Sequence, residues 1–354
     1  MYTYDDVITF VSQEDVKFIR LTFFDVFGRQ KNVSVMPSTL AAAFRDGVAF
    51  DAGEICGFSG AGQLKLFPDP STLAVLPWRP SHGRVVRMYC ELKRPDGSPY
   101  ELDARRILKE TSACAAKAGI VLSAASRTGF YLFRTGEDGA PTCEPFDRAG
   151  FMDVYPDDLG ENVRRAICLS MEDMGLRPLT SHHEAGPGQN EITFAPSSPL
   201  SAADDAATFR WVVKSVSMQN GLAADFSPAP LENAPVSTAR VSLTVGNADD
   251  KTFFAGIASR LGDIALFLRP SSAAWSVPLD LSVSDGTAVV SGVDPSSDPY
   301  LVLSLLISAG LEGASLSDIG DIPCDLAAAI ARAERSEFVR AAVPAGFTAA
   351  YGGK

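Results

Sequence analysis

The segment "SHHEAGPGQNEITF", residues 181–194, places two histidines and two glutamates on either side of a Gly-Pro-Gly turn. Because side chains alternate along a strand, the second arm places Glu191 on the opposite side from Asn190 and Ile192. The turn brings the arm that carries Glu184 back beside the arm that carries Glu191. We therefore predict a β-hairpin with two carboxylates close together.

Two carboxylates at such a distance can hold a hard divalent cation such as Mg²⁺ or Mn²⁺, which prefers oxygen ligands. Two ligands alone make a weak site, and this segment by itself favours a polar hairpin with solvated acids. Adjacent strand residues point in opposite directions, so His182 and His183 are not expected to bind the same ion. A metal site therefore depends on ligands from elsewhere in the chain.

The composition limits the classes of function. A chain of 354 residues with 46% hydrophobic residues is long enough for one large domain or two smaller ones. Its net charge of -12, with no basic run, argues against nucleic-acid and membrane partners. It has no apolar stretch of membrane-spanning length and no signal peptide pattern, so we expect a cytoplasmic protein. The six scattered cysteines lack metal-type spacing and are expected to be buried, reduced thiols.

The first part of the chain, residues 1–102, is predicted to form a small α+β domain. A hairpin is expected over residues 16–36, with a turn at "DVFG". A short helix follows over residues 38–47, where a glycine stands in the stop position. Strands are predicted over residues 72–78 and 84–92.

Longer elements alternate after Asp103, and we predict a second domain over residues 103–354. Asp103 is expected to cap the first helix, and Ser201 the third. The predicted helices cover residues 104–119, 157–174, 201–221, 251–268, 298–313 and 324–343, and the predicted strands, besides the hairpin, cover residues 121–133 and 278–292.

Several stretches in this order resemble glutamine synthetase, the ATP-dependent ligase that joins ammonia to glutamate. They are "FDVFGRQKNV" (24–33), "FPDPSTLAVLPWRP" (67–80), the hairpin, "DPYLVL" (298–303) and "AGLEG" (309–313). The resemblance covers nearly the whole chain. It implies an α+β fold with a β-grasp-like N-terminal domain and a larger domain whose curved antiparallel sheet is backed by helices. It also implies a homo-oligomeric ring or double ring, and it leaves open mixing with an active paralogue.

The resemblance also assigns site residues. Glu184 and Glu191 match two carboxylates of one metal site, and Asp51 matches the acid that a neighbouring subunit lends to the ammonium pocket. The family carries a Glu-x-Glu pair before its aromatic strand, and here these positions read Arg127 and Gly129. One metal ligand is thus replaced by a cation and another by a residue without a side chain.

Further positions depart from the family pattern. Arg240 ends the segment "VSTAR" that aligns with the family's G-S-G-M-H loop, and a guanidinium cannot ligate a divalent cation. Val289 and Ser291 align with the family's E-x-R, a metal carboxylate and a phosphate-binding arginine. The stretch before "SDGTAVVSG" is also too short to hold the family's glutamate flap.

Phosphoryl transfer relies on metals and cationic side chains around the developing charge, and losing one such group commonly costs about 3 kcal/mol. Since several groups are lost together, we expect a catalytically inactive homologue with a structural, regulatory or anion-binding role and no cofactor. In the alternative, an ATP-dependent γ-glutamyl ligase keeps Mg²⁺ or Mn²⁺ with ATP in a rebuilt site. Arg127 or Arg240 then binds a substrate carboxylate. In a third hypothesis, the same arginines hold an anionic metabolite without turnover. Pairing of these arginines with Glu184 or Glu191 would favour the first hypothesis.

Overall fold

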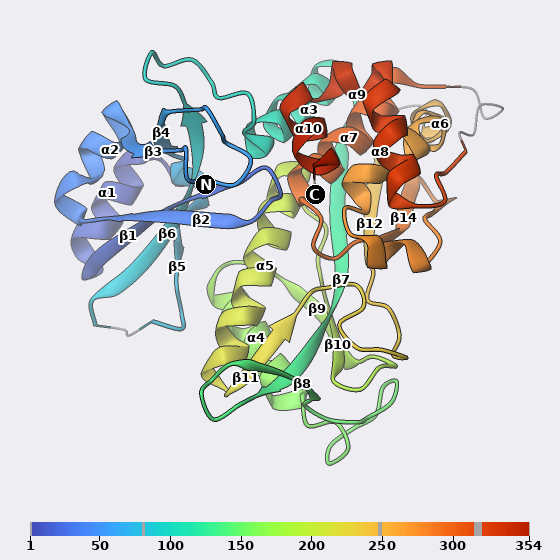
Figure 1. Cartoon of the computed structure of the whole chain (residues 1–354). Coiled ribbons are helices and arrows are strands. Elements are labelled where there is room, and N and C mark those ends of the chain that lie inside the picture. The colour runs from blue at the N-terminus through green and yellow to red at the C-terminus, as the bar shows by residue number, and fades with distance from the viewer. Residues whose placement is uncertain (1, 80–81, 247–249, 315–320, 354) are drawn as a thin grey trace.

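The computed structural model describes residues 2–79, 82–246, 250–314 and 321–353. In this part of the chain the strands form two sheets, each in its own lobe (Figure 1). The smaller sheet uses strands between residues 16 and 93, and the larger sheet uses strands between residues 122 and 293. The predicted two-part α+β fold is confirmed. The boundary between residues 102 and 103 stays a prediction.

The N-terminal lobe is built on the predicted hairpin. Strands β1 (Val16–Phe24) and β2 (Gln30–Val35) pair antiparallel, and β1 runs parallel to β6 (Arg84–Lys93). The sheet order is β2-β1-β6-β4-β3, and β5 pairs with β6. The other elements are α1 (Tyr4–Gln13), η1 (Pro37–Thr39), α2 (Leu40–Asp46), β3 (Val48–Asp51), β4 (Gln63–Pro68), η2 (Pro70–Thr72) and β5 (Ala74–Val75).

One prediction for this lobe is corrected, and one helix was missed. The strand expected over residues 72–78 is reduced to Ala74–Val75, because the Asp69 side chain caps a 3-10 turn, accepting the Ser71 N–H. Helix α1 was not predicted at all. Thr3 and Asp6 cap each other's backbone at its start, a capping box with aspartate in place of the usual glutamate.

The larger lobe contains the curved antiparallel sheet. Its order is β13-β14-β12-β7-β10-β9, and β8 and β11 pair with the second half of β7 (Leu122–Thr135). The other strands are β8 (Pro141–Pro145), β9 (Pro178–His183), β10 (Gln189–Phe194), β11 (Leu222–Asp225), β12 (Ala239–Val245), β13 (Asp280–Ser284) and β14 (Thr287–Val293).

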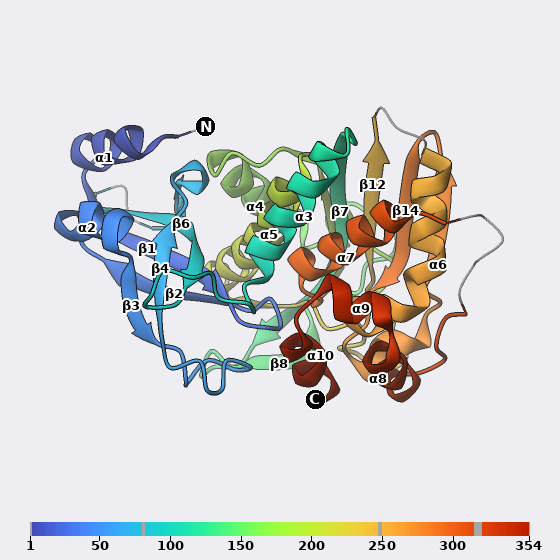
Figure 2. The same ribbon diagram turned by 90° about the horizontal axis from the view of Figure 1, so that it is seen from above.

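Helices cover one face of this sheet. Side chains of α4 and α5 pack against Phe130 and Ile192, which point away from Glu191. Helices α3, α6, α7 and α8 pack together, as Figure 2 shows from above, in a core that continues into the N-terminal lobe. The helices are α3 (Ala104–Lys117), α4 (Glu161–Asp173), α5 (Pro199–Gln219), α6 (Asp250–Leu268), η3 (Ser272–Ser276), α7 (Pro299–Glu312), α8 (Leu326–Arg335), α9 (Glu337–Ala342) and α10 (Ala345–Gly352).

The boundaries of three predicted helices differ, because a polar side chain near each boundary makes a contact that was not expected. Helix α4 begins at Glu161 rather than near residue 157, because Asp158 is buried in an ion pair with Arg164. Ser198, not Ser201, caps α5. The helix predicted over residues 324–343 is divided at Ser336. The Ser336 side chain accepts the Val339 N–H and so caps α9, whereas α8 ends at Arg335.

The cysteines are free, as expected, but they are not all buried. Only Cys90 is fully buried, and Cys168 is intermediate, whereas the other four are exposed. Residue type alone favours burial of cysteine, but most of these positions lie on outer faces of their elements or in turns. Among the described residues, no helix combines the length and hydrophobicity needed to cross a membrane.

Candidate functional site on the large sheet

The hairpin predicted over residues 181–194 forms, and its first strand begins earlier, at Pro178. Glu191 lies opposite His182 and Asn190 lies opposite His183, so the two histidines point to different faces of the sheet. His183 and Asn190 are fully buried on the helix-covered side. The opposite side, which we call the site face, carries His182, Glu184 and Glu191.

The Gly-Pro-Gly turn depends on two close approaches. A Cβ on Gly186 would lie 2.5 Å from the Tyr131 hydroxyl, and one on Gly188 would lie 2.6 Å from the Leu132 carbonyl oxygen. Gly188 also has a φ of +67°, which glycine adopts without strain. The Tyr131 hydroxyl donates to the Pro235 carbonyl at 2.5 Å. Burial, with the negative charge of Glu184, raises the pKa of Tyr131 to about 12, so this donor stays protonated.

Glu191 forms an ion pair with Arg127 on the neighbouring strand β7. The guanidinium donates to Glu191 Oε1 from Nε at 2.6 Å, and its Nη2 lies 2.5 Å from the same oxygen. The Glu191 side chain is 9% exposed and that of Arg127 is 41% exposed. Arg127 is therefore paired, as the hypothesis of an inactive homologue expected.

His182 joins the two glutamates. Its Nε2 lies 3.1 Å from Glu184 Oε1 and 3.9 Å from Glu191 Oε1. Ligand atoms of these three residues lie within 4.8 Å of one another, a spacing that suits a metal ion. However, the Arg127 guanidinium contacts the same Glu191 oxygen and would repel a cation placed there. The arrangement of these residues is therefore that of an arginine–carboxylate pair rather than that of a divalent metal site.

Gly129 lies directly opposite Glu191, and the space beside it is taken by Ser237. A Cβ on Gly129 would lie 3.3 Å from the Ser237 hydroxyl oxygen. Ser237 is buried and accepts a 3.0 Å hydrogen bond from Gln189 Nε2. A longer side chain at position 129 would therefore meet this hydroxyl.

Arg240 lies opposite Arg127, on β12, and its side chain is exposed. Unlike Arg127, it has no carboxylate partner in the part of the chain that the structure describes. Val289 lies opposite Ser242 on the next strand, β14, and Ser291 follows two residues later. The sheet thus brings the substituted positions Arg127, Gly129, Arg240, Val289 and Ser291 to three adjacent strands, where none of them is an acid.

Asp51 is not brought to this face. It ends β3, the edge strand of the N-terminal sheet, and its carboxylate accepts the Gly53 N–H at 2.9 Å. Figure 1 shows β3 and β10 in different lobes. The role of Asp51, as an acid lent to a neighbouring subunit, stays a prediction.

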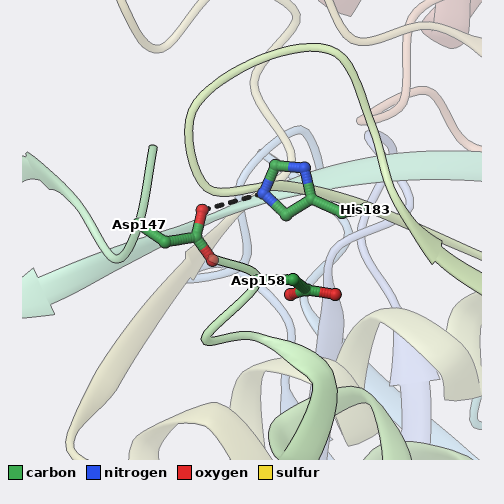
Figure 3. A group of neighbouring side chains, drawn as sticks. All are labelled: Asp147, Asp158 and His183. Carbon is green, nitrogen blue, oxygen red and sulfur yellow. Dashed lines mark hydrogen bonds and ion pairs between the residues drawn. The ribbon is translucent and has the colours of Figure 1, made fainter. Parts of the chain in front are cut away.

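Behind the hairpin lies a buried cluster of Asp147, Asp158 and His183 (Figure 3). His183 Nε2 lies 2.8 Å from Asp147 Oδ1, and its Nδ1 lies 2.6 Å from the Glu184 carbonyl oxygen. Burial alone would lower the pKa of His183, but the hydrogen bond and charge of Asp147 outweigh it and raise the pKa above 6.5. A protonated imidazole donates from both nitrogens and has no lone pair for a metal.

The rest of this cluster is also satisfied. Asp147 accepts the N–H groups of Gly188, at 3.0 Å, and Leu159, at 3.1 Å. Asp158 is bound at both oxygens by Arg164, which reaches Asn190 as well. Although this group has the residue types of a metal site, it is a structural network that fixes the hairpin to the start of α4.

Sequence reasoning missed three residues of the site. It did not identify which of His182 and His183 lies on the site face, although the alternation of β10 and its register with β9 place His182 there. No sequence pattern indicated Ser237 or Tyr131 as site residues, because their contacts depend on the path of the irregular segment before β12.

Comparisons with known proteins agree with this architecture. Residues 15–95 match the family profile described as "Glutamine synthetase, beta-Grasp domain", and residues 101–266 match "Glutamine synthetase, catalytic domain". The chain is 36% identical to a glutamine synthetase of Clostridium saccharobutylicum, over 88% of this chain and 80% of that protein. It is 32% identical to that of Mycolicibacterium smegmatis, over 87% of this chain and 79% of that protein.

Solved structures share the fold at lower identity. One described as "Apo GmaS without ligand" is 22% identical, with a TM-score of 0.86 over 98% of this chain and 94% of that chain. Another, described as "Crystal structure of novel glutamine synthase homolog", is 19% identical, with a TM-score of 0.82 over 96% of this chain and 93% of that chain.

Proposed function

This chain belongs to the glutamine synthetase family, and we propose that it is a non-catalytic member in which an arginine–glutamate pair has replaced a divalent cation. The single observation that carries this proposal is the contact between the Arg127 guanidinium and Glu191 Oε1, at 2.5 and 2.6 Å. In a ligase that activates a carboxylate with ATP, that glutamate must be available to a metal. Here it is bound to a fixed positive charge of the protein itself.

The neighbouring positions support the same proposal. Gly129 offers no side chain, and Ser237 fills the space beside it. Val289 and Ser291 offer no carboxylate on β14. Each lost group of this kind commonly costs about 3 kcal/mol of transition-state stabilisation, a factor of about 100 in rate. Even when such losses are not additive, turnover should fall below detection.

Metal binding is the direct test. We expect wild-type protein to bind Mn²⁺ weakly in an electron paramagnetic resonance titration. We expect Arg127→Glu to bind it at least about tenfold more tightly, because the change removes a cation and adds a ligand beside Glu184 and Glu191. Arg134→Glu makes the same change of charge further along β7 and should have no such effect. Tight Mn²⁺ binding by the wild type, unchanged in Arg127→Glu, would contradict the proposal.

Nucleotide binding provides a second test. Isothermal titration of Mg-ATP into the wild type should show no saturable binding that depends on the site face. Micromolar binding that is lost in both Glu184→Gln and Glu191→Gln would overturn the proposal, because it would mean that the two glutamates still hold a metal–nucleotide complex.

One observation favours a second candidate, an ATP-dependent ligase with a changed substrate. Arg240 is exposed on the site face and has no carboxylate partner in the described part of the chain, so its guanidinium is available for a substrate carboxylate. ADP release should then occur with some member of a panel of acids and amines and disappear in Arg240→Gln. Absence of ADP release with every pair would leave the non-catalytic proposal.

A further inference from the structure

A cavity of about 440 Å³ lies between the two lobes, away from the site face. The turn after β1 forms one wall, α5 forms another, and Phe226, which follows β11, also lines it. Helix α5 packs on the side of the large sheet that carries Phe130, opposite the side that carries Arg127 and Glu191. The cavity is therefore separate from the site face.

Three cationic side chains line this cavity, Arg29, Arg210 and Lys214, and no carboxylate lines it. Arg210 donates to the Ser297 carbonyl at 3.0 Å, and the carboxylates of Asp298 and Asp294, which act on this guanidinium, do not line the cavity. Partial burial and the positive charge of Arg210 lower the pKa of Lys214, and Arg29 adds to this effect against the pull of Asp225. Both arginines thus repel Lys214, and a bound anion would relieve that repulsion.

The remaining wall is largely aromatic, with Phe24, Phe27, Trp211 and Phe226. The Arg29 guanidinium lies 5.8 Å from the ring centre of Phe27, and Lys214 Nζ lies 5.9 Å from that of Phe226. Such a surface suits a flat apolar body whose charged group faces the cations.

One polar atom at the cavity also lacks a partner. Gln30 lines the cavity, and its Oε1 is buried with no hydrogen bond within the described part of the chain. A buried acceptor left unpaired costs free energy, and a donor on a bound molecule would satisfy it. The cavity volume is within the range of small-molecule sites, about 300–1,000 Å³.

We propose that this cavity binds a small molecule with a planar aromatic body and one anionic group, a carboxylate or a phosphate. The anionic group lies among Arg29, Arg210 and Lys214, and the aromatic body lies against Trp211 and Phe226. This site would exist whether or not the site face binds a metal, so it does not depend on the non-catalytic proposal.

Calorimetric titration with benzoate, phenyl phosphate and inorganic phosphate tests the proposal. We expect saturable binding of benzoate or phenyl phosphate, at least about tenfold tighter than that of inorganic phosphate, which has no aromatic body. The preferred aromatic anion identifies the charged group as a carboxylate or a phosphate. The double variant Arg29→Gln, Lys214→Gln should lose at least about tenfold in affinity, and it should fold because both side chains are exposed.

The matched control is Lys117→Gln, which removes an exposed charge at the end of α3 and should bind like the wild type. Three results would overturn the proposal. They are that neither aromatic anion shows saturable binding, that inorganic phosphate binds as tightly as both of them, or that the double variant keeps the affinity of the wild type.

Discussion

The two faces of the β9–β10 hairpin carry the same kinds of residue but differ in how completely these residues are paired. On the buried face, His183 has acceptors at both ring nitrogens, and Arg164 binds both oxygens of Asp158. On the site face, His182 and Arg127 share the glutamates, and Arg240 has no carboxylate partner in the described part of the chain.

This difference separates a structural network from a candidate site. The buried network fixes the hairpin to the start of α4. In the non-catalytic function that we propose, this network keeps the hairpin in place while the charges of the site face no longer suit a metal. A fold can keep its framework when the chemistry of a site changes.

The largest difference between the faces should appear when their arginines are exchanged for methionine. Arg164→Met leaves Asp158 and Asn190 buried without their donor and should lower the free energy of unfolding by about 3–5 kcal/mol. Arg127→Met should cost about 1 kcal/mol or less, because its side chain is 41% exposed and solvent screens its ion pair. Urea unfolding followed by tryptophan fluorescence measures both. Equal losses would mean that the faces do not differ in this way.

The two histidines offer a smaller contrast. His183→Gln should cost about 1–3 kcal/mol, because a glutamine side chain cannot satisfy both Asp147 and the Glu184 carbonyl from within the core. His182→Gln should change the free energy of unfolding by about 0.5 kcal/mol or less, since glutamine can still donate to Glu184. Urea unfolding of both variants tests this prediction. A larger loss of stability in His182→Gln than in His183→Gln would contradict it.

The smallest effect concerns pH. Because the pKa of His183 is raised above 6.5, its stabilising contribution is complete below about pH 6.5 and is lost as pH rises through the folded-state value. Burial opposes the ionisation of Asp147, but its bond with His183 lowers its pKa below 3.8. Its contribution is therefore lost only as pH falls through that lower value. Stability should then decline as pH rises above about 6.5.

His183→Gln serves as the control for this decline. Burial raises the pKa of Asp298 to about 7, so this carboxyl group also lowers stability as pH rises from the ordinary aspartate value toward about 7. Only the difference between the wild type and His183→Gln therefore reports on the histidine. If their unfolding free energies run parallel from pH 6 to pH 8, the imidazolium does not stabilise the hairpin.

Much of the fold could be predicted from the sequence, because its signals are local. The hairpin of β1 and β2, the Asp103 cap of α3 and the glycines that end α2 and α7 follow from alternation and turn chemistry. The prediction was wrong where a distant contact decided the boundary. The start of α4 depends on the buried pair of Asp158 and Arg164.

The candidate site divides in the same way. The resemblance singled out Arg127 and Glu191, and pairing of an arginine with Glu184 or Glu191 was one of the alternatives considered. The choice of Glu191 as the partner of Arg127 depends on the register of β7 and β10, which the sequence does not specify. The contact of Ser237 with Gly129 follows from a segment of irregular backbone that has no periodicity in the sequence. That segment had been interpreted only as a substituted loop.

The hydroxyl of Ser237 also constrains substitutions at position 129. A Cβ at position 129 would lie 3.3 Å from that hydroxyl oxygen, so Ser237 would have to shift by a few tenths of an ångström. Gln189 donates to the same hydroxyl, and moving it would also disturb a buried hydrogen bond. The stability of a variant with an acid at position 129 should therefore depend on the residue at position 237, which makes the two positions energetically coupled.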